Sequence, residues 1–228
     1  MRIVRYFLAV DKEKRMKNIV ILGDSYSTYE GWIPDGFDVY YSSSGRENGP
    51  AVSKMKLEET WWQRLLLKTG ANLLANNSWS GSTVGYTGYS GDCSHSSSFI
   101  YRFRQLKESG FFKKNDVDTV FLFGGTNDSC ANAPLGEVKF ENWTEEDLFS
   151  VLPAICHLIW AVKKELPNAD VYFIINTQIN PAIGACVKSA CAHYGTRAIE
   201  LVDIDKENGH PTPKGMEMIC NQVLSIIQ

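Results

Sequence analysis

Five mainly apolar stretches along the chain predict five buried β-strands. They lie at residues 19–22, 73–75, 117–123, 171–175 and 198–202. The first, third and fourth are nearly continuous in apolar residues rather than alternating with polar ones. Such runs are typical of parallel strands whose sheet is covered on both faces.

Longer segments with helical spacing separate these stretches. Helices are predicted at residues 54–68, 99–108, 144–166, 183–194 and 212–227. In the first of them, Trp61, Leu65 and Leu66 recur on one side, and Gly70 follows as a stop. Thr144, with acidic residues behind it, is a cap for the third, and Gly195 closes the fourth.

The alternation of strand and helix predicts an α/β protein with a five-stranded parallel sheet in a three-layer α/β/α sandwich. In such a sheet, every loop that leaves the end of a strand opens on the same edge, where ligands bind. Two loops, residues 26–53 and 80–98, are too long for tight turns and are rich in Tyr, Trp, Gly and Ser. Loops of this length in a compact domain usually carry function.

The length of 228 residues suits a single domain, expected over residues 17–228, with residues 1–16 as an extension or tail. Either Met1 or Met16 could be the true start. The net charge of −3 gives no electrostatic reason to expect nucleic acid as a partner. No apolar run is long enough to span a bilayer, and residues 1–15 lack a secretory pattern, so a cytoplasmic location is expected. The sequence leaves the oligomeric state open.

The six cysteines are expected to be free and mostly buried thiols, because a chain of this length does not need disulfide staples. Cys186, Cys191 and His193 suggest a metal at first sight. No second ligand pair follows at zinc spacing, so no metal is expected.

A serine and a histidine at opposite ends of the chain are candidates for nucleophile and base. Ser25 lies in Gly-Asp-Ser directly behind the first strand, and a serine hydroxyl needs a base within hydrogen-bond reach. His210 follows the fifth strand, so its loop opens on the same sheet edge. Among the other histidines, His157 fits a packed helix position and His193 a helix end, which leaves His95 as the competitor.

Candidate acids and oxyanion donors also follow strands. Glu207, three residues before His210, can present its carboxylate to the imidazole, with Asp203 and Asp205 as alternatives. The oxyanion of acyl transfer needs preorganised donors. Asn127, behind the third strand, and the backbone N–H groups of Gly81 and Ser25 are the candidates.

Taken in this order, the motifs resemble the SGNH branch of the GDSL hydrolases, from residue 19 to about residue 219. Gly-Asp-Ser, Gly81 with Asn76 before it, Gly125-Thr126-Asn127-Asp128 and His210-Pro211 match the four family blocks. The resemblance implies a flavodoxin-like SGNH fold and ester hydrolysis through an acyl-enzyme, with no metal or organic cofactor. Ser25 is then the nucleophile, His210 the base, and Ser25, Gly81 and Asn127 the oxyanion donors. Glu207 departs from the aspartate usual in the last block, so a serine–histidine dyad is an alternative.

The aromatic residues of the long loops suggest the substrate. Aromatic faces beside Ser, Asn and Gly suit sugar rings, so an acetyl ester of a carbohydrate is the favoured substrate. The residues expected to line its site are Tyr26, Trp32, Trp79 and Tyr86. The alternative for these aromatics is that they pack the loops against the core. An acylhydrolase of the lipase or thioesterase type, acting on longer acyl chains, and a non-catalytic carbohydrate-binding domain on the same fold are the alternatives.

Overall fold

The computed structural model describes residues 16–227, which form an α/β domain around a parallel sheet. The five strands lie in the order β2-β1-β5-β6-β7. Their bounds are β1, Asn18–Gly23; β2, Asn72–Ser78; β5, Thr119–Phe123; β6, Asp170–Ile175; and β7, Arg197–Glu200. The predicted five-stranded parallel sheet is confirmed. Of the predicted extension or tail, residues 1–16, residues 1–15 lie outside the described part of the chain.

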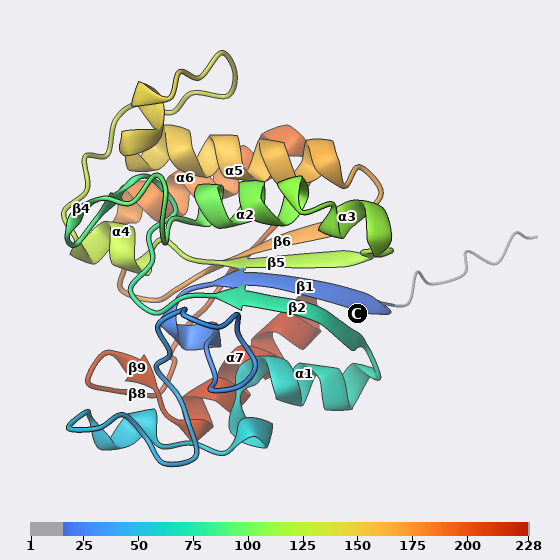
Figure 1. Cartoon of the computed structure of the whole chain (residues 1–228), viewed down its shortest axis with the longest axis vertical. Helices are drawn as coiled ribbons and strands as arrows, with labels where there is room; N and C mark the ends of the chain where they lie inside the picture. The colour runs from blue at the N-terminus through green and yellow to red at the C-terminus, as the bar shows by residue number, and fades with distance from the viewer. Residues whose placement is uncertain (1–15, 228) are drawn as a thin grey trace, which may run out of the picture.

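Helices cover both faces of this sheet, which confirms the three-layer sandwich (Figure 1). The upper layer in that view contains α2, Phe99–Glu108; α3, Phe111–Lys114; α5, Val151–Glu165; and α6, Pro181–Tyr194. The lower layer contains α1, Trp61–Thr69, and α7, Pro213–Ile227. No helix within residues 16–227 is long and apolar enough to cross a membrane.

The central strands are buried on both sides, which explains their continuous apolar sequences. In β1, Val20 and Leu22 belong to the core beneath α2, α5 and α6. Their neighbours Ile19 and Ile21 belong to the second core, against α1 and α7. Because successive side chains of a strand point to opposite faces, one apolar run supplies both cores.

Two predicted helices begin later than expected. The helix expected from residue 54 begins at Trp61, after a separate 3-10 turn at Leu57–Glu59, because the Thr60 hydroxyl accepts from the Gln63 backbone N–H and caps it there. The helix expected from residue 144 is divided. A 3-10 turn at Glu146–Phe149 ends at the extended residue Ser150, and α5 begins at Val151.

Thr144 does not cap α5, because its hydroxyl instead accepts from the backbone N–H of Asp147, within the 3-10 turn, at 3.3 Å. The backbone N–H of Val151 donates to the carbonyl of Pro134. This tertiary bond sets the start of α5 and is invisible in the local sequence. The predicted stops are confirmed, because Gly70 and Gly195 take left-handed conformations at the ends of α1 and α6.

Two small hairpins lie at the carboxyl end of the sheet, where β4, α4, β8 and β9 gather (Figure 1). One pairs β3, Thr87–Gly88, with β4, Gly91–Asp92. The other pairs β8, Lys206–Glu207, with β9, His210–Pro211. The short helix α4, Thr126–Cys130, follows β5 at the same end.

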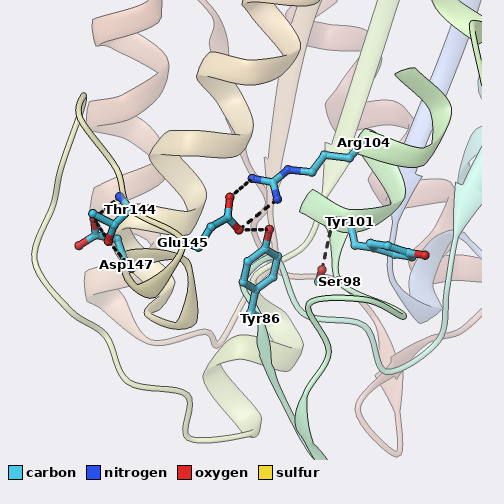
Figure 2. Close-up of polar contacts among 7 residues, drawn as sticks. All are labelled: Tyr86, Ser98, Tyr101, Arg104, Thr144, Glu145 and Asp147. Carbon is cyan, nitrogen blue, oxygen red and sulfur yellow. Dashed lines mark hydrogen bonds and ion pairs between the residues drawn. The ribbon is translucent and has the colours of Figure 1, made fainter. Parts of the chain in front are cut away.

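A polar cluster fastens the upper layer to the loop that precedes β3. The guanidinium of Arg104 in α2 forms two hydrogen bonds with the carboxylate of Glu145, of 2.9 and 3.1 Å (Figure 2). The hydroxyl of Tyr86 donates to the same carboxylate at 3.2 Å. Paired bonds of this kind fix the geometry of both partners. The segment entering the β3–β4 hairpin therefore has a firm attachment.

Candidate active site

Ser25 begins a single 3-10 turn, Ser25–Ser27, directly behind β1. The carboxylate of Asp24 caps this turn by accepting from the backbone N–H of Tyr26 at 3.0 Å. A Cβ at Gly23 would lie 2.6 Å from Ser27 Cβ and from Ser78 Oγ, so glycine is required where the chain leaves the strand. The tight exit brings the Ser25 hydroxyl to the end of the sheet with 6% of the residue exposed.

The imidazole of His210 meets the hydroxyl of Ser25. His210 Nε2 lies 3.0 Å from Ser25 Oγ, although 185 positions separate the two residues. This is the distance that a base needs to accept the proton of a nucleophilic hydroxyl. The expected meeting of the two groups at one sheet edge is therefore present in the structure.

A two-residue turn positions His210. Asn208 and Gly209, with φ of 48° and 75°, connect β8 to β9. Positive φ at both central residues defines a type I′ turn, which favours Asn-Gly. The tyrosine hydroxyls of the long loop secure the far strand, because Tyr26 donates to the carbonyl of Gly209 and Tyr41 to the carbonyl of Pro211.

The ring of Tyr40 lies flat on the imidazole of His210. The ring centroids are 3.6 Å apart and the planes differ by 9°. Burial, together with the positive charges of Arg46 and Lys206, lowers the pKa of His210 below its usual value of 6.5. The imidazole is therefore neutral at pH 7, which is the state that can accept a proton from serine.

Glu207 does not make the expected contact with His210. The two residues are directly paired across the hairpin, but Glu207 is exposed and the carboxylate forms no hydrogen bond within the described residues. Nδ1 of His210 instead lies 3.2 Å from the carbonyl oxygen of Asn208. A carbonyl only accepts, so Nδ1 carries the hydrogen and Nε2 is free to accept from Ser25. The type I′ turn is the reason, since it brings its own carbonyl to the ring.

The two alternative acids are also placed elsewhere. The carboxylate of Asp205 accepts from the hydroxyl of Thr212 at the start of α7. Asp203 is an exposed residue with a positive φ of 51°. The described contacts of His210 are thus those of a serine–histidine pair supported by a backbone carbonyl.

The side chain of Asn127 is joined to the loop that contains Gly81. Nδ2 of Asn127 donates to the carbonyl of Ser82 at 2.9 Å, and Oδ1 accepts from the hydroxyl of Tyr89 at 3.2 Å. Gly81 has a positive φ of 79°, and no atom would lie within 4 Å of a Cβ added there. The space that a side chain would fill at Gly81 is thus open, and the role of its backbone N–H as a donor stays a prediction.

Arg102 is a site residue that the sequence interpretation missed. The side chain is 1% exposed, and the guanidinium donates to Gly23 O at 3.2 Å, Ser82 Oγ at 3.0 Å and Asn77 Oδ1 at 3.0 Å. It therefore connects the segments that carry Ser25 and Gly81. A signal was present in the sequence, because Arg102 is on the same helical face as Phe99 and Phe103, which are buried.

Two buried carboxyl groups lie in the same region. Asp128 accepts from the backbone N–H groups of Val84 and Gly85, and burial raises its pKa to about 6. Burial raises the pKa of Asp24 to about 7. The positive charge of Arg102 opposes the rise at Asp24. The region behind Ser25 thus contains three buried ionisable groups.

Two of the four proposed sugar-stacking aromatics do not face solvent. Tyr26 and Tyr86 are buried in the two cores, so their assignment to a substrate platform is wrong. Trp79 is half-buried and packs on Phe37, with centroids 4.3 Å apart, while Trp32 is exposed. The position of an aromatic residue in a loop does not show whether its ring packs in the core or faces solvent.

The other three histidines are engaged elsewhere, and all six cysteines carry free thiols. His157 packs between Trp143 and Trp160, His193 stacks on Phe140, and His95 lies against Tyr101. No cluster of three metal-ligating side chains occurs within residues 16–227.

Comparison with known proteins gives a consistent result. Residues 17–227 match the model of the GDSL-like lipase/acylhydrolase family. A solved structure from Bacteroides ovatus, described as a GDSL-like lipase, is 39% identical with a TM-score of 0.83, covering 93% of this chain and 98% of that chain. A similarly described protein from Bacteroides uniformis is 39% identical with a TM-score of 0.82, covering 92% and 95%.

More distant solved structures show the same fold. An acetyl xylan esterase from Butyrivibrio proteoclasticus is 16% identical with a TM-score of 0.60, and the match covers 92% of this chain and 63% of that chain. Comparison with curated proteins gives no match.

A serine hydroxyl paired with an imidazole at the carboxyl edge of a five-stranded parallel sheet defines an ester hydrolase of the SGNH class. The family model covers nearly the whole described chain, and two structures share more than a third of its residues. The chain belongs to the GDSL-like lipase/acylhydrolase family, and it is a serine ester hydrolase.

Proposed function

We propose that this chain hydrolyses small acyl esters, acetyl esters above all, on a carbohydrate or other polar alcohol. The observation that carries the proposal is the 3.0 Å contact between Ser25 Oγ and His210 Nε2. Ser25 is the nucleophile, His210 is the general base and acid, and Asn127 with the backbone N–H groups of Gly81 and Ser25 stabilises the oxyanion.

The reaction passes through an acyl-enzyme. Ser25 Oγ forms a bond to the ester carbonyl carbon while its proton moves to His210 Nε2. The tetrahedral species collapses as the bond to the alcohol breaks, and His210 returns the proton to the leaving oxygen. Water then attacks the acyl-serine, with His210 again taking and returning a proton, which releases the acid and restores Ser25.

Two uncharged groups stabilise the positive imidazolium that forms in these steps. The Asn208 carbonyl accepts from Nδ1–H, and the face of Tyr40 lies against the ring. Both groups favour a cationic ring, the first as a dipole and the second through its π face. This arrangement supports catalysis by a serine–histidine dyad, the alternative that the substitution of Glu207 raises.

The surroundings of the pair favour a polar substrate. A groove of about 890 Å³ has a mixed lining, with polar side chains such as Gln178 and apolar ones such as Met218, and neither Ser25 nor His210 lines it. A smaller groove of about 340 Å³ includes Tyr40, Asp38 and Arg46. The mostly polar lining of the smaller groove, which includes the ring that stacks on His210, suits hydroxyl-rich alcohols better than long acyl chains. The fold shared with an acetyl xylan esterase is in agreement with this choice.

The test is hydrolysis of p-nitrophenyl acetate, butyrate and octanoate by the full chain. We expect the highest kcat/KM on acetate, and loss of activity by about 10⁴-fold or more in Ser25→Ala and His210→Ala. Ser225→Ala, which changes an exposed serine on α7, is the matched control and should behave like the wild type. Rates that rise toward octanoate would instead favour the alternative acylhydrolase on longer chains.

A non-catalytic carbohydrate-binding domain is a second candidate, favoured by the missing carboxylate partner of His210. It predicts equal background rates for the wild type and Ser25→Ala. It also predicts binding of an unesterified oligosaccharide that both proteins retain in a calorimetric titration.

A further inference from the structure

Tyr89 stands at the tip of the β3–β4 hairpin. Gly88 pairs with Gly91, so Tyr89 and Ser90 form a two-residue connection, and Gly91 leaves it with a φ of 97°. The side chain of Tyr89 extends from this tip, and the residue is 59% exposed. The residue belongs to neither of the two cores.

The base of the hairpin is anchored. Tyr86, just before β3, donates to the carboxylate that Arg104 holds with two bonds (Figure 2). The Thr87 hydroxyl donates to the carbonyl of Phe149 at 2.7 Å, and the Cys93 backbone N–H to the carbonyl of Tyr86 at 2.8 Å. Tyr89 therefore projects from a fixed base.

The hydroxyl of Tyr89 reaches the side chain of Asn127. It donates to Oδ1 at 3.2 Å, while Nδ2 of the same amide donates to the carbonyl of Ser82 at 2.9 Å. A carboxamide has two N–H donors, and the carbonyl of Ser82 occupies one of them. With both ends of the amide held, its plane is fixed and the second N–H is left for a ligand.

We propose that Tyr89 is a positioning residue for the oxyanion site, holding the amide of Asn127 so that its second N–H meets the developing negative charge. The inference rests on the proposed function, in which Asn127 is an oxyanion donor. Donation to Oδ1 also polarises the amide, which strengthens its N–H groups as donors.

The protonation state of Tyr89 suits this role. Although the residue is 59% exposed, its hydroxyl end lies against the buried Asn127, and this desolvation, with Cys130, Asp24 and Asp128 nearby, raises the pKa of Tyr89 to about 12. The phenol therefore keeps its proton at neutral pH and donates to Oδ1 throughout the range in which His210 is neutral.

The first test compares Tyr89→Phe with the wild type on p-nitrophenyl acetate. Removal of one oxyanion donor costs about 10²–10³-fold in kcat elsewhere, and loss of a group that only orients the donor is expected to cost about 5–30-fold. KM should stay within about twofold, because the ring remains and the bond acts on the transition state. Tyr101→Phe, on α2, is the matched control and should match the wild type.

A double-mutant cycle separates positioning from a general structural effect. In the Asn127→Ala background, Tyr89→Phe should cause no further loss of kcat, because the amide that it orients is gone. Full additivity of the two losses, or an unchanged kcat in Tyr89→Phe, would overturn the inference.

A second measurement does not depend on turnover. The side-chain amide signals of Asn127, identified in a ¹⁵N–¹H spectrum by their absence in Asn127→Ala, should shift in Tyr89→Phe and stay in place in Tyr101→Phe. Unshifted signals in Tyr89→Phe contradict the inference, even in a protein that hydrolyses no ester. Absence of hydrolysis with shifted signals contradicts the proposed function and leaves the positioning role supported.

Discussion

At the scale of the residue, His210 is held by neutral groups alone. The carbonyl of Asn208 meets Nδ1, Tyr40 covers one face, and Ser25 meets Nε2. Glu207 is directly opposite in the hairpin but extends into solvent. Three residues of separation in sequence indicated that the carboxylate and the imidazole are near one another. The spacing could not show which acceptor Nδ1 of His210 contacts, because that depends on the backbone conformation of the turn.

Glu207→Gln separates these two acceptors. It removes the charge and leaves the Asn208 carbonyl in place, so kcat/KM on p-nitrophenyl acetate is expected to change by less than about threefold. The pH at which activity is half-maximal should remain below 6.5, since burial of His210 sets the direction of its pKa shift. A drop of 10²-fold or more would assign the carboxylate a direct role during turnover.

At the scale of the element, the strands and helices of the sandwich were predictable, and the hairpins were not. Strands that are buried on both faces have continuous apolar sequences, which predicted the sheet. Glycine is common just after a helix, and Gly70 and Gly195 correctly predicted the ends of α1 and α6. The hairpins pair only two residues on each side, too few for an alternating pattern. Ser25, His210, Gly81 and Asn127 could be identified because each follows a strand. Arg102 left one signal, its place on the buried face of α2, but its partners lie in distant segments with no fixed spacing, as does the partner of Tyr89.

The turn between β8 and β9 has a measurable role in activity. Gly209→Ala puts a Cβ at a φ of 75° and is expected to cost about 1 kcal/mol in unfolding free energy, because L-residues disfavour this region. Gly195→Ala is the matched control, since its φ is 66° and its Cβ also meets open space.

Both glycine variants should lose similar stability in denaturant titrations. Only Gly209→Ala should lose kcat, by about 10-fold or more, because a small displacement of His210 disturbs its contact with Ser25. Equal activities in the two variants would show that the turn tolerates the change.

At the scale of the whole molecule, the buried carboxyl groups link stability to pH. The pKa of Asp24 is about 7 in the folded protein against an ordinary value of 3.8, so the folded state binds this proton more strongly than the unfolded chain does. Its contribution to stability is therefore fully present below about pH 4 and is lost as the pH rises through about 7. Asp128 adds a shift in the same direction.

Asp24→Asn tests this link. Asparagine keeps an oxygen for the backbone N–H of Tyr26 and cannot ionise. The unfolding free energy of the variant minus that of the wild type should therefore increase by at least about 1 kcal/mol from pH 5 to pH 8. Asp92→Asn is the control. Its side chain is exposed, and hydrogen bonds from Ser94 lower its pKa, so its effect is confined to acid pH. A constant difference for Asp24→Asn across this range would contradict the assigned shift.

The buried guanidinium of Arg102 limits how the molecule can move during turnover. Its hydrogen bonds join α2 to the exit of β1, to the end of β2 and to Ser82. These segments are therefore expected to move as one unit. A bulky alcohol must therefore enter without separating the exit of β1 from the loop that contains Ser82, since the guanidinium holds the two together.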